Sequence, residues 1–137
     1  MTLVTTSRKA IPEIRTLARA FAMATGSEFV TRGKMGLSDL FTRDTHIIIF
    51  TQETGGTRVQ FFTDEDLVGD YLILSVRIDD RTDTAIHGLG TPQPGKYAAL
   101  TPLIPVCTTG METNPDTCIV DGPQKKRFFC RMVPYGA

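Results

Sequence analysis

The residues of this chain that are best suited to chemistry are cations, and they gather in its first quarter. Residues 1–34 hold six of the fifteen basic residues and two acidic ones, so this segment carries a net charge of +4 (six minus two) in a chain that is neutral overall. Clustered cations suit the binding of an anion such as phosphate. A solvated basic face without a ligand is the alternative that the pattern leaves open. The six cations are Arg8, Lys9, Arg15, Arg19, Arg32 and Lys34.

Two features beside these cations favour an anion. Arg8 and Lys9 precede a predicted helix, where the positive end of the helix dipole disfavours cations unless an anion offsets them. Exposed N–H groups at the helix start, together with the hydroxyl groups of Thr6 and Ser7, would donate to a phosphate.

A strand, a helix and a second strand must position these residues. Residues 3–6 are apolar and β-branched, which predicts a short strand, and residues 28–31 predict another. Between them, Pro12 and apolar residues at helical spacing predict a helix over residues 12–25. If the two strands are parallel neighbours, both basic clusters leave the same edge of the sheet, where ligands usually bind.

The remaining pattern indicates one domain over residues 1–137, of the α/β class, built as a layered mixed sheet with a βαβ opening. A short helix is predicted near Ser38, an acidic turn at 64–66, and a loop between two halves at 79–96. The other predicted strands cover residues 46–51, 57–63, 71–78, 116–121 and 125–133.

The last of these strands begins with Lys125, Lys126 and Arg127. We interpret it as an edge strand protected by its charges, with RNA contact as the alternative. Its hairpin would place Asp121 opposite Arg127. The same register places Cys118 opposite Cys130, close enough for a disulfide to form on oxidation.

Catalysis finds little support in the sequence. His46 and His87 lie in unrelated contexts, and the three cysteines lack the spacing of a zinc site. The glycine-rich stretch over residues 88–95 lacks both the following helix and the Lys-Ser/Thr pair of a phosphate-binding loop. We therefore expect no enzyme, no cofactor and no metal. An odd number of cysteines and the absence of an export signal or a membrane-spanning run predict a cytoplasmic protein without a membrane partner.

The opening motifs resemble those of the archaeal Brix-domain proteins of ribosome biogenesis. The resemblance rests on TTSRK (5–9), on a helix bearing two arginines, and on FVTRGKMGLSDL (29–40). The closing GPQKKRFFCRMV (122–133) is similar more loosely. The resemblance implies a fold similar to the anticodon-binding domain of class II aminoacyl-tRNA synthetases. It also implies binding of ribosomal RNA, and not of DNA, during rRNA processing and subunit assembly, without catalysis.

Two other functions stay open beside RNA binding. One is a protein-interaction module of pre-ribosomal particles with little direct RNA contact, which the chain's neutrality favours. The other is an enzyme or small-molecule binder that uses an α/β crevice, which rests on fold analogy alone. The residues predicted to bind RNA are Thr6, Ser7, Arg8, Lys9, Arg15, Arg19, Arg32, Lys34, Lys125, Lys126 and Arg127.

Overall fold

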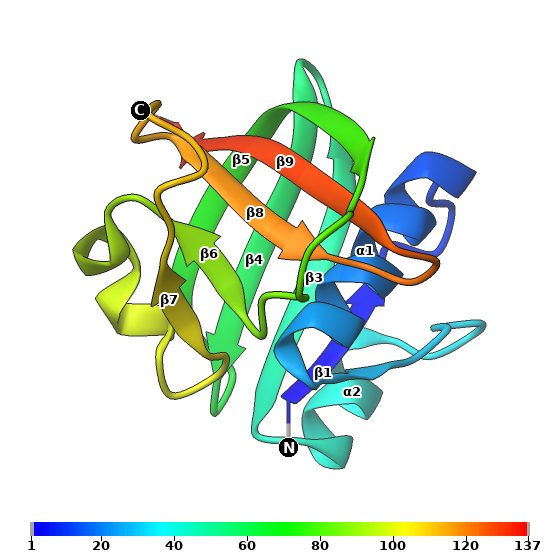
Figure 1. The fold of residues 1–137 in the computed structure, drawn as a ribbon. Coiled ribbons are helices and arrows are strands. Elements are labelled where there is room, and N and C mark those ends of the chain that lie inside the picture. The colour runs from blue at the N-terminus through cyan, green and yellow to red at the C-terminus, as the bar shows by residue number, and fades with distance from the viewer. Residues whose placement is uncertain (1, 137) are drawn as a thin grey trace.

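A nine-stranded mixed sheet forms the centre of the structure, a computed structural model that describes residues 2–136 (Figure 1). The strands follow the order β2-β1-β3-β4-β5-β9-β8-β6-β7 across the sheet. The predicted α/β class and mixed sheet are therefore confirmed. In chain order the elements are β1 (Thr2–Thr6), α1 (Pro12–Thr25), β2 (Glu28–Phe29), α2 (Leu37–Arg43), β3 (His46–Glu53), β4 (Gly56–Thr63), β5 (Asp66–Asp80), β6 (Leu89–Thr91), the 3-10 helix η1 (Pro94–Leu100), β7 (Val106–Thr108), β8 (Thr117–Asp121) and β9 (Lys126–Pro134).

The βαβ opening forms as the sequence predicts. The helix α1 begins at Pro12, whose missing N–H costs nothing in the first turn. It ends at Gly26, whose φ of +70° lets the chain turn sharply while its N–H donates to the Met23 carbonyl. β1 runs parallel to β2 on one side and to β3 on the other. The second strand is shorter than predicted, because pairing with β1 stops at Phe29.

Apolar residues cover both faces of the sheet at β1 and β3. Val4 and Ile48 pack under α1 in the larger core, while Leu3 and Ile47 pack with Leu40 of α2 on the opposite face. Successive strand residues point to opposite faces, so a strand with consecutive buried residues needs cover on both sides. The first half of the sheet is therefore packed on both faces beneath the segments that leave its edge.

β9 lies inside the sheet, hydrogen-bonded to β5 on one side and to β8 on the other. The prediction of an edge strand is therefore wrong. Its charges do not guard an edge, because Lys126 pairs with Asp80 and Arg127 pairs with Asp121. The predicted register of the last hairpin is confirmed: Asp121 is opposite Arg127, and Cys118 is opposite Cys130.

The predicted loop over 79–96 is only partly a loop. β5 continues to Asp80, β6 begins at Leu89, and η1 follows. β6 is three residues long and gains its structure from pairing with both β7 and β8. No helix within residues 2–136 is both long and apolar enough to span a membrane.

Candidate nucleic-acid interface

The two basic clusters of the N-terminal segment meet at one backbone carbonyl. Arg8 and Arg32 each donate from Nε to the carbonyl oxygen of Met35, at 3.3 Å in both cases. Arg8 also donates from Nη2 to the carbonyl of Lys34 at 3.4 Å. Burial first, and then the neighbouring charge of Arg8, lower the pKa of the Arg32 guanidinium. Two cations are thus held near one another, as the predicted topology required.

The parallel pairing of β1 with β2 produces this convergence. The Val30 N–H donates to the Val4 carbonyl, and the Thr5 hydroxyl donates to the Val30 carbonyl at 2.6 Å. Both segments therefore leave the sheet at the same end. Beyond β2 the chain turns at Gly33, whose φ of +55° suits glycine, and the Met35 N–H closes the turn on the Arg32 carbonyl.

Thr6 and Ser7 differ in what they offer an anion. Thr6 is buried, and its hydroxyl donates to the Ser7 carbonyl at 3.0 Å. Ser7 is half-buried, and its backbone N–H donates to the Phe50 carbonyl. Among the hydrogen bonds of residues 2–136, none uses the Ser7 hydroxyl, so this group is free to donate outward.

The start of α1 offers fewer donors than predicted. Pro12 has no N–H, and the N–H groups of Ile14 and Arg15 both donate to the Ile11 carbonyl, at 3.1 and 3.2 Å. Glu13 then places a carboxylate in the first turn. Two of the N–H groups at this helix start are therefore already engaged, contrary to expectation, and the Ser7 hydroxyl and the arginine side chains remain as donors.

Arg15 and Arg19 lie on the exposed face of α1. The Arg19 guanidinium lies 5.0 Å from the ring centroid of Phe29, a cation–π contact that holds it toward β2. Arg19 thus lies beside the strand that leads to Arg32. The sequence did not identify Phe29 or the Met35 carbonyl as parts of the interface, because neither carries a charge.

The C-terminal basic residues have different surroundings. Arg127 is buried and donates to both carboxylate oxygens of Asp121, at 2.7 and 2.9 Å, and it pairs with Asp83 at 3.0 Å. These hydrogen bonds raise the pKa of Arg127. Lys126 pairs with Asp80, whereas Lys125 is exposed in the turn before β9. The structure therefore brings Lys125 to the surface and engages its two neighbours in ion pairs.

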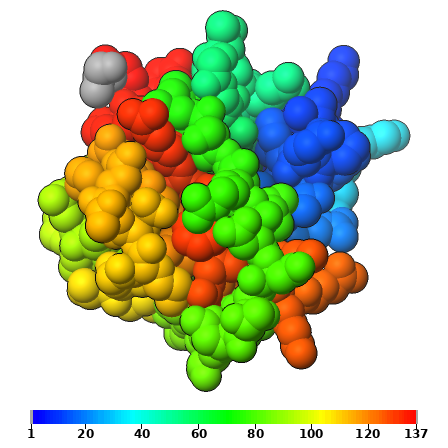
Figure 2. Space-filling model, turned by 45° about the horizontal axis from the view of Figure 1, so that its top comes forward, coloured from blue at the N-terminus to red at the C-terminus, as the bar shows by residue number. Residues whose placement is uncertain are grey.

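The segments that carry the predicted RNA contacts project on the same side of the molecule. The turn after β1, the turn after β2 and the hairpin between β8 and β9 lie at the right in both Figure 1 and Figure 2, coloured blue, cyan and orange. The hairpin also touches α1, since a Cβ on Gly122 would come within 2.7 Å of the Ala20 Cβ.

Comparisons with known proteins agree with this architecture. No family model matches the chain. A protein of Methanosarcina mazei, described as a probable Brix domain-containing ribosomal biogenesis protein, is 34% identical over 92 residues. The match covers 66% of this chain and 57% of the relative, so it spans little more than half of the relative's length.

Two crystal structures share the fold. Mil, an archaeal Imp4-like protein, aligns with a TM-score of 0.65 at 16% identity, covering 97% of this chain and 99% of Mil. A probable ribosomal biogenesis protein from Aeropyrum pernix aligns with a TM-score of 0.67 at 15% identity, covering 99% and 97%. The chain thus has the fold of these archaeal proteins and a sequence relative named for the Brix domain, which confirms the resemblance to archaeal Brix-domain proteins that its opening motifs predict.

Proposed function

We propose that this chain is a Brix-domain protein of ribosome biogenesis that binds ribosomal RNA and acts without catalysis. Residues 1–137 would form one such domain, related in fold to the anticodon-binding domain of class II aminoacyl-tRNA synthetases. It would work in the cytoplasm alongside pre-ribosomal proteins. The relative in Methanosarcina mazei and the two structural neighbours support the family assignment, and the distribution of ion pairs supports the RNA contact.

The observation that carries the proposal is the segregation of unpaired cations. Within residues 2–136, none of the six cations of the N-terminal segment forms an ion pair. Of the nine that follow, seven pair with carboxylates: Arg43, Arg58, Arg77, Arg81, Lys96, Lys126 and Arg127. Although the chain is neutral overall, the positive charges of its N-terminal segment are therefore not compensated by carboxylates. An anion bound there would offset them.

Backbone carbonyls, rather than carboxylates, orient the side chains of Arg8 and Arg32. A guanidinium has five N–H donors in a fixed fork. Arg8 uses two of them on carbonyls and Arg32 uses one, so each retains donors for phosphate oxygens. Single-stranded or looped RNA fits this site better than duplex. The bases of an unpaired strand are splayed out, so arginine side chains can contact them more readily than in a duplex.

The experiment is a salt series with matched double variants. Fluorescent ribosomal RNA fragments are titrated with wild type, with Arg8→Ala/Arg32→Ala, and with Arg77→Ala/Lys96→Ala. Both variants lose two positive charges, but only the first removes unpaired ones. We expect the first to lose affinity and to flatten the dependence of log K on log salt by about 1.4, for two phosphates at about 0.7 each. Equal losses in the two variants would contradict the proposal.

A further inference from the structure

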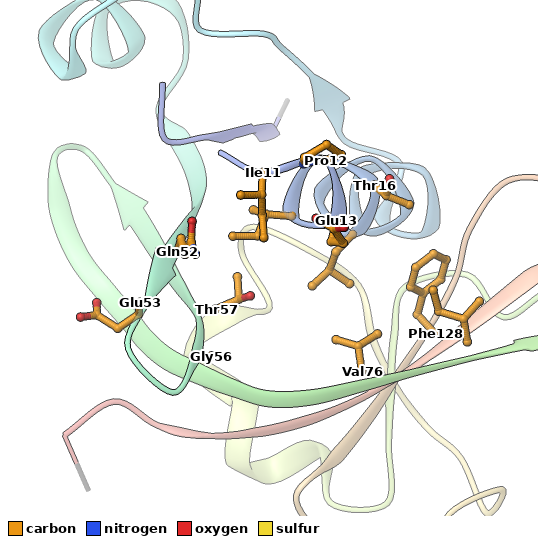
Figure 3. Close-up of a pocket in the computed structure, with 13 residues that line it drawn as sticks. Ile11, Pro12, Glu13, Thr16, Gln52, Glu53, Gly56, Thr57, Val76 and Phe128 are labelled. Atoms are coloured by element: carbon orange, nitrogen blue, oxygen red, sulfur yellow. The ribbon is translucent and has the colours of Figure 1, made fainter. Parts of the chain in front are cut away.

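A groove at the beginning of α1 is lined by none of the six N-terminal cations, which we call the basic surface (Arg8, Lys9, Arg15, Arg19, Arg32 and Lys34). It has a volume of about 640 Å³ and opens between the start of α1, the tip of the β3–β4 hairpin and β5. Figure 3 shows Ile11 and Val76 extending into the space between α1 and β5, with Gln52 and Thr57 at its hairpin wall. The floor is formed by the buried side chains of Ile14, Leu17 and Phe128.

The groove exposes apolar side chains that face the core side of the sheet. Val76 is opposite Cys130, and Ile78 is opposite Phe128, so both point to the same face as these core residues. They are nevertheless 41% and 51% exposed, and Ile11 across the groove is 39% exposed. The reason is that α1 begins at Pro12 and leaves this end of the inner face uncovered. Contiguous exposed apolar side chains of this kind mark interaction sites.

The charge of the groove decides which partner fits. Its charged lining residues are Glu13 and Glu53. Within residues 2–136, no cation pairs with Glu13. Glu53 lies 4.0 Å from Nη1 of Arg58, whose shorter contacts, at 2.7 and 2.9 Å, go to Asp70. Two carboxylates beside an apolar floor repel RNA phosphates and attract a cation.

We propose that this groove docks a segment of another protein that presents apolar side chains beside a Lys or Arg. The apolar side chains cover Ile11, Val76 and Ile78, and the cation meets Glu13 or Glu53. This contact is separate from the basic surface and does not depend on RNA binding. The chain would thus join an RNA to a protein through two surfaces of opposite charge.

Selection from a random peptide display library tests this proposal. The immobilised protein is wild type, Ile78→Asp, or the charge-swapped variant Glu13→Lys/Glu53→Lys. Leu74→Asp serves as the matched control, because Leu74 lies on the same strand and is 41% exposed but does not line the groove. All of these positions are exposed or half-buried, and circular dichroism melts establish that each variant is folded.

We expect wild type to enrich peptides with apolar residues next to Lys or Arg. Synthetic copies should bind Ile78→Asp about tenfold more weakly or worse, because a buried uncompensated carboxylate costs more than the free energy of a tenfold change. They should bind Leu74→Asp as they bind wild type, and the charge-swapped variant should enrich acidic peptides instead.

Four results would overturn the proposal. The library could yield no enriched sequence, or its peptides could bind Ile78→Asp unchanged. A wild-type dimer that Ile78→Asp abolishes, seen by light scattering, would mean that a second copy fills the groove. Competition between the peptides and an RNA fragment that persists in Arg8→Ala/Arg32→Ala would mean that RNA fills it.

Discussion

The Nε atoms of Arg8 and Arg32 lie at the same distance, 3.3 Å, from the carbonyl oxygen of Met35. One backbone acceptor thus fixes two guanidinium groups that come from the ends of two different strands. A carboxylate in that place would hold them as firmly but would cancel their charge. The carbonyl orients them and leaves the charge available.

This geometry predicts that lysine cannot replace arginine here. Arg8→Lys/Arg32→Lys keeps both charges but loses the planar fork that the carbonyl orients. We expect weaker RNA binding with an unchanged salt slope, because the number of cations at the surface is the same. Fluorescence anisotropy across a salt series measures both quantities. If the lysine variant bound as tightly as wild type, charge alone would explain the site.

The turn at Gly33 should be sensitive to backbone conformation alone. A Cβ on Gly33 would meet no described atom within 4 Å, so a side chain has room there, but the φ of +55° disfavours most residues. Left-handed backbone costs a non-glycine residue about 1–2 kcal/mol, and asparagine tolerates it best. Gly33→Val should therefore weaken RNA binding more than Gly33→Asn does. Equal affinities of the two variants would show that the turn does not position Arg32.

Variants of Lys125 and Arg127 should have different effects, one on RNA affinity and the other on the stability of the fold. Arg127→Ala removes the closest cation from the buried Asp121 carboxylate and leaves it Arg81 at 3.9 Å and the Ile86 N–H. We expect the free energy of unfolding to fall by about 3 kcal/mol in urea titrations, the lower end of the cost of breaking a buried ion pair. Lys125→Ala should leave stability unchanged and should flatten the RNA salt slope by about 0.7 if it contacts one phosphate. An Arg127→Ala protein that folds normally yet loses RNA affinity would make Arg127 a direct contact.

The same ion pair predicts a loss of stability in acid. Burial opposes ionisation of Asp121, but hydrogen bonds from Arg127 and from the Ile86 N–H outweigh it and lower the pKa of the carboxyl. The stabilisation is therefore fully present above the unfolded-state pKa of about 3.9 and is lost as the pH falls through the lower folded-state pKa. Urea unfolding between pH 2 and 6 should show a shallower decline for Asp121→Leu/Arg127→Met than for wild type. Parallel profiles would contradict the assignment.

The cysteines predict a loss of stability in alkali. Burial raises the pKa of Cys118 to about 11 and that of Cys130 to about 12. The folded state therefore favours neutral thiols, a stabilisation that is complete below the unfolded-state pKa of about 8.5 and falls as the pH rises above it. Cys118→Ala/Cys130→Ala should flatten the decline in unfolding free energy above that pH.

Thiol labelling provides a second measurement on the same residues. In native protein, iodoacetamide should react with half-buried Cys107 before the two buried thiols. Cys118 and Cys130 lie opposite one another, as the predicted disulfide requires. Both are buried, so an oxidant reaches them poorly and the disulfide should form slowly. Equal labelling rates at all three cysteines would contradict this burial.

Local sequence signals predicted those elements whose start and end are marked by residues within the element itself. Helix α1 has Pro12 at its start and Gly26 at its end, so its bounds were predictable. The last hairpin has alternating side chains around a Gly-Pro turn, so its register was predictable too. β6 was not, because its three residues form a strand only when β7 and β8 arrive from elsewhere in the chain.

The candidate site, too, was predictable only in the parts that depend on local sequence signals. The meeting of Arg8 and Arg32 followed from parallel strands, which the sequence predicted. The Met35 carbonyl that anchors them, and the absence of ion pairs around them among residues 2–136, depend on distances between segments that are far apart in the sequence. The edge-strand prediction for β9 failed for the same reason, because its pairing with β5 joins segments that are far apart in the sequence. The role of its charges was missed too, because Asp80, Asp83 and Asp121 meet its first two residues only in the folded chain.

The position of β9 inside the sheet has a consequence for synthesis of the chain. β5 ends at Asp80, and the strand that covers its free edge begins only at Lys126. A nascent chain on the ribosome therefore presents β5, fifteen residues long, with one edge unpaired until Lys126–Pro134 has emerged. Unpaired strands recruit other strands, and sheets closed by distant segments form slowly. Truncation before Lys126 should yield aggregates rather than a smaller folded unit.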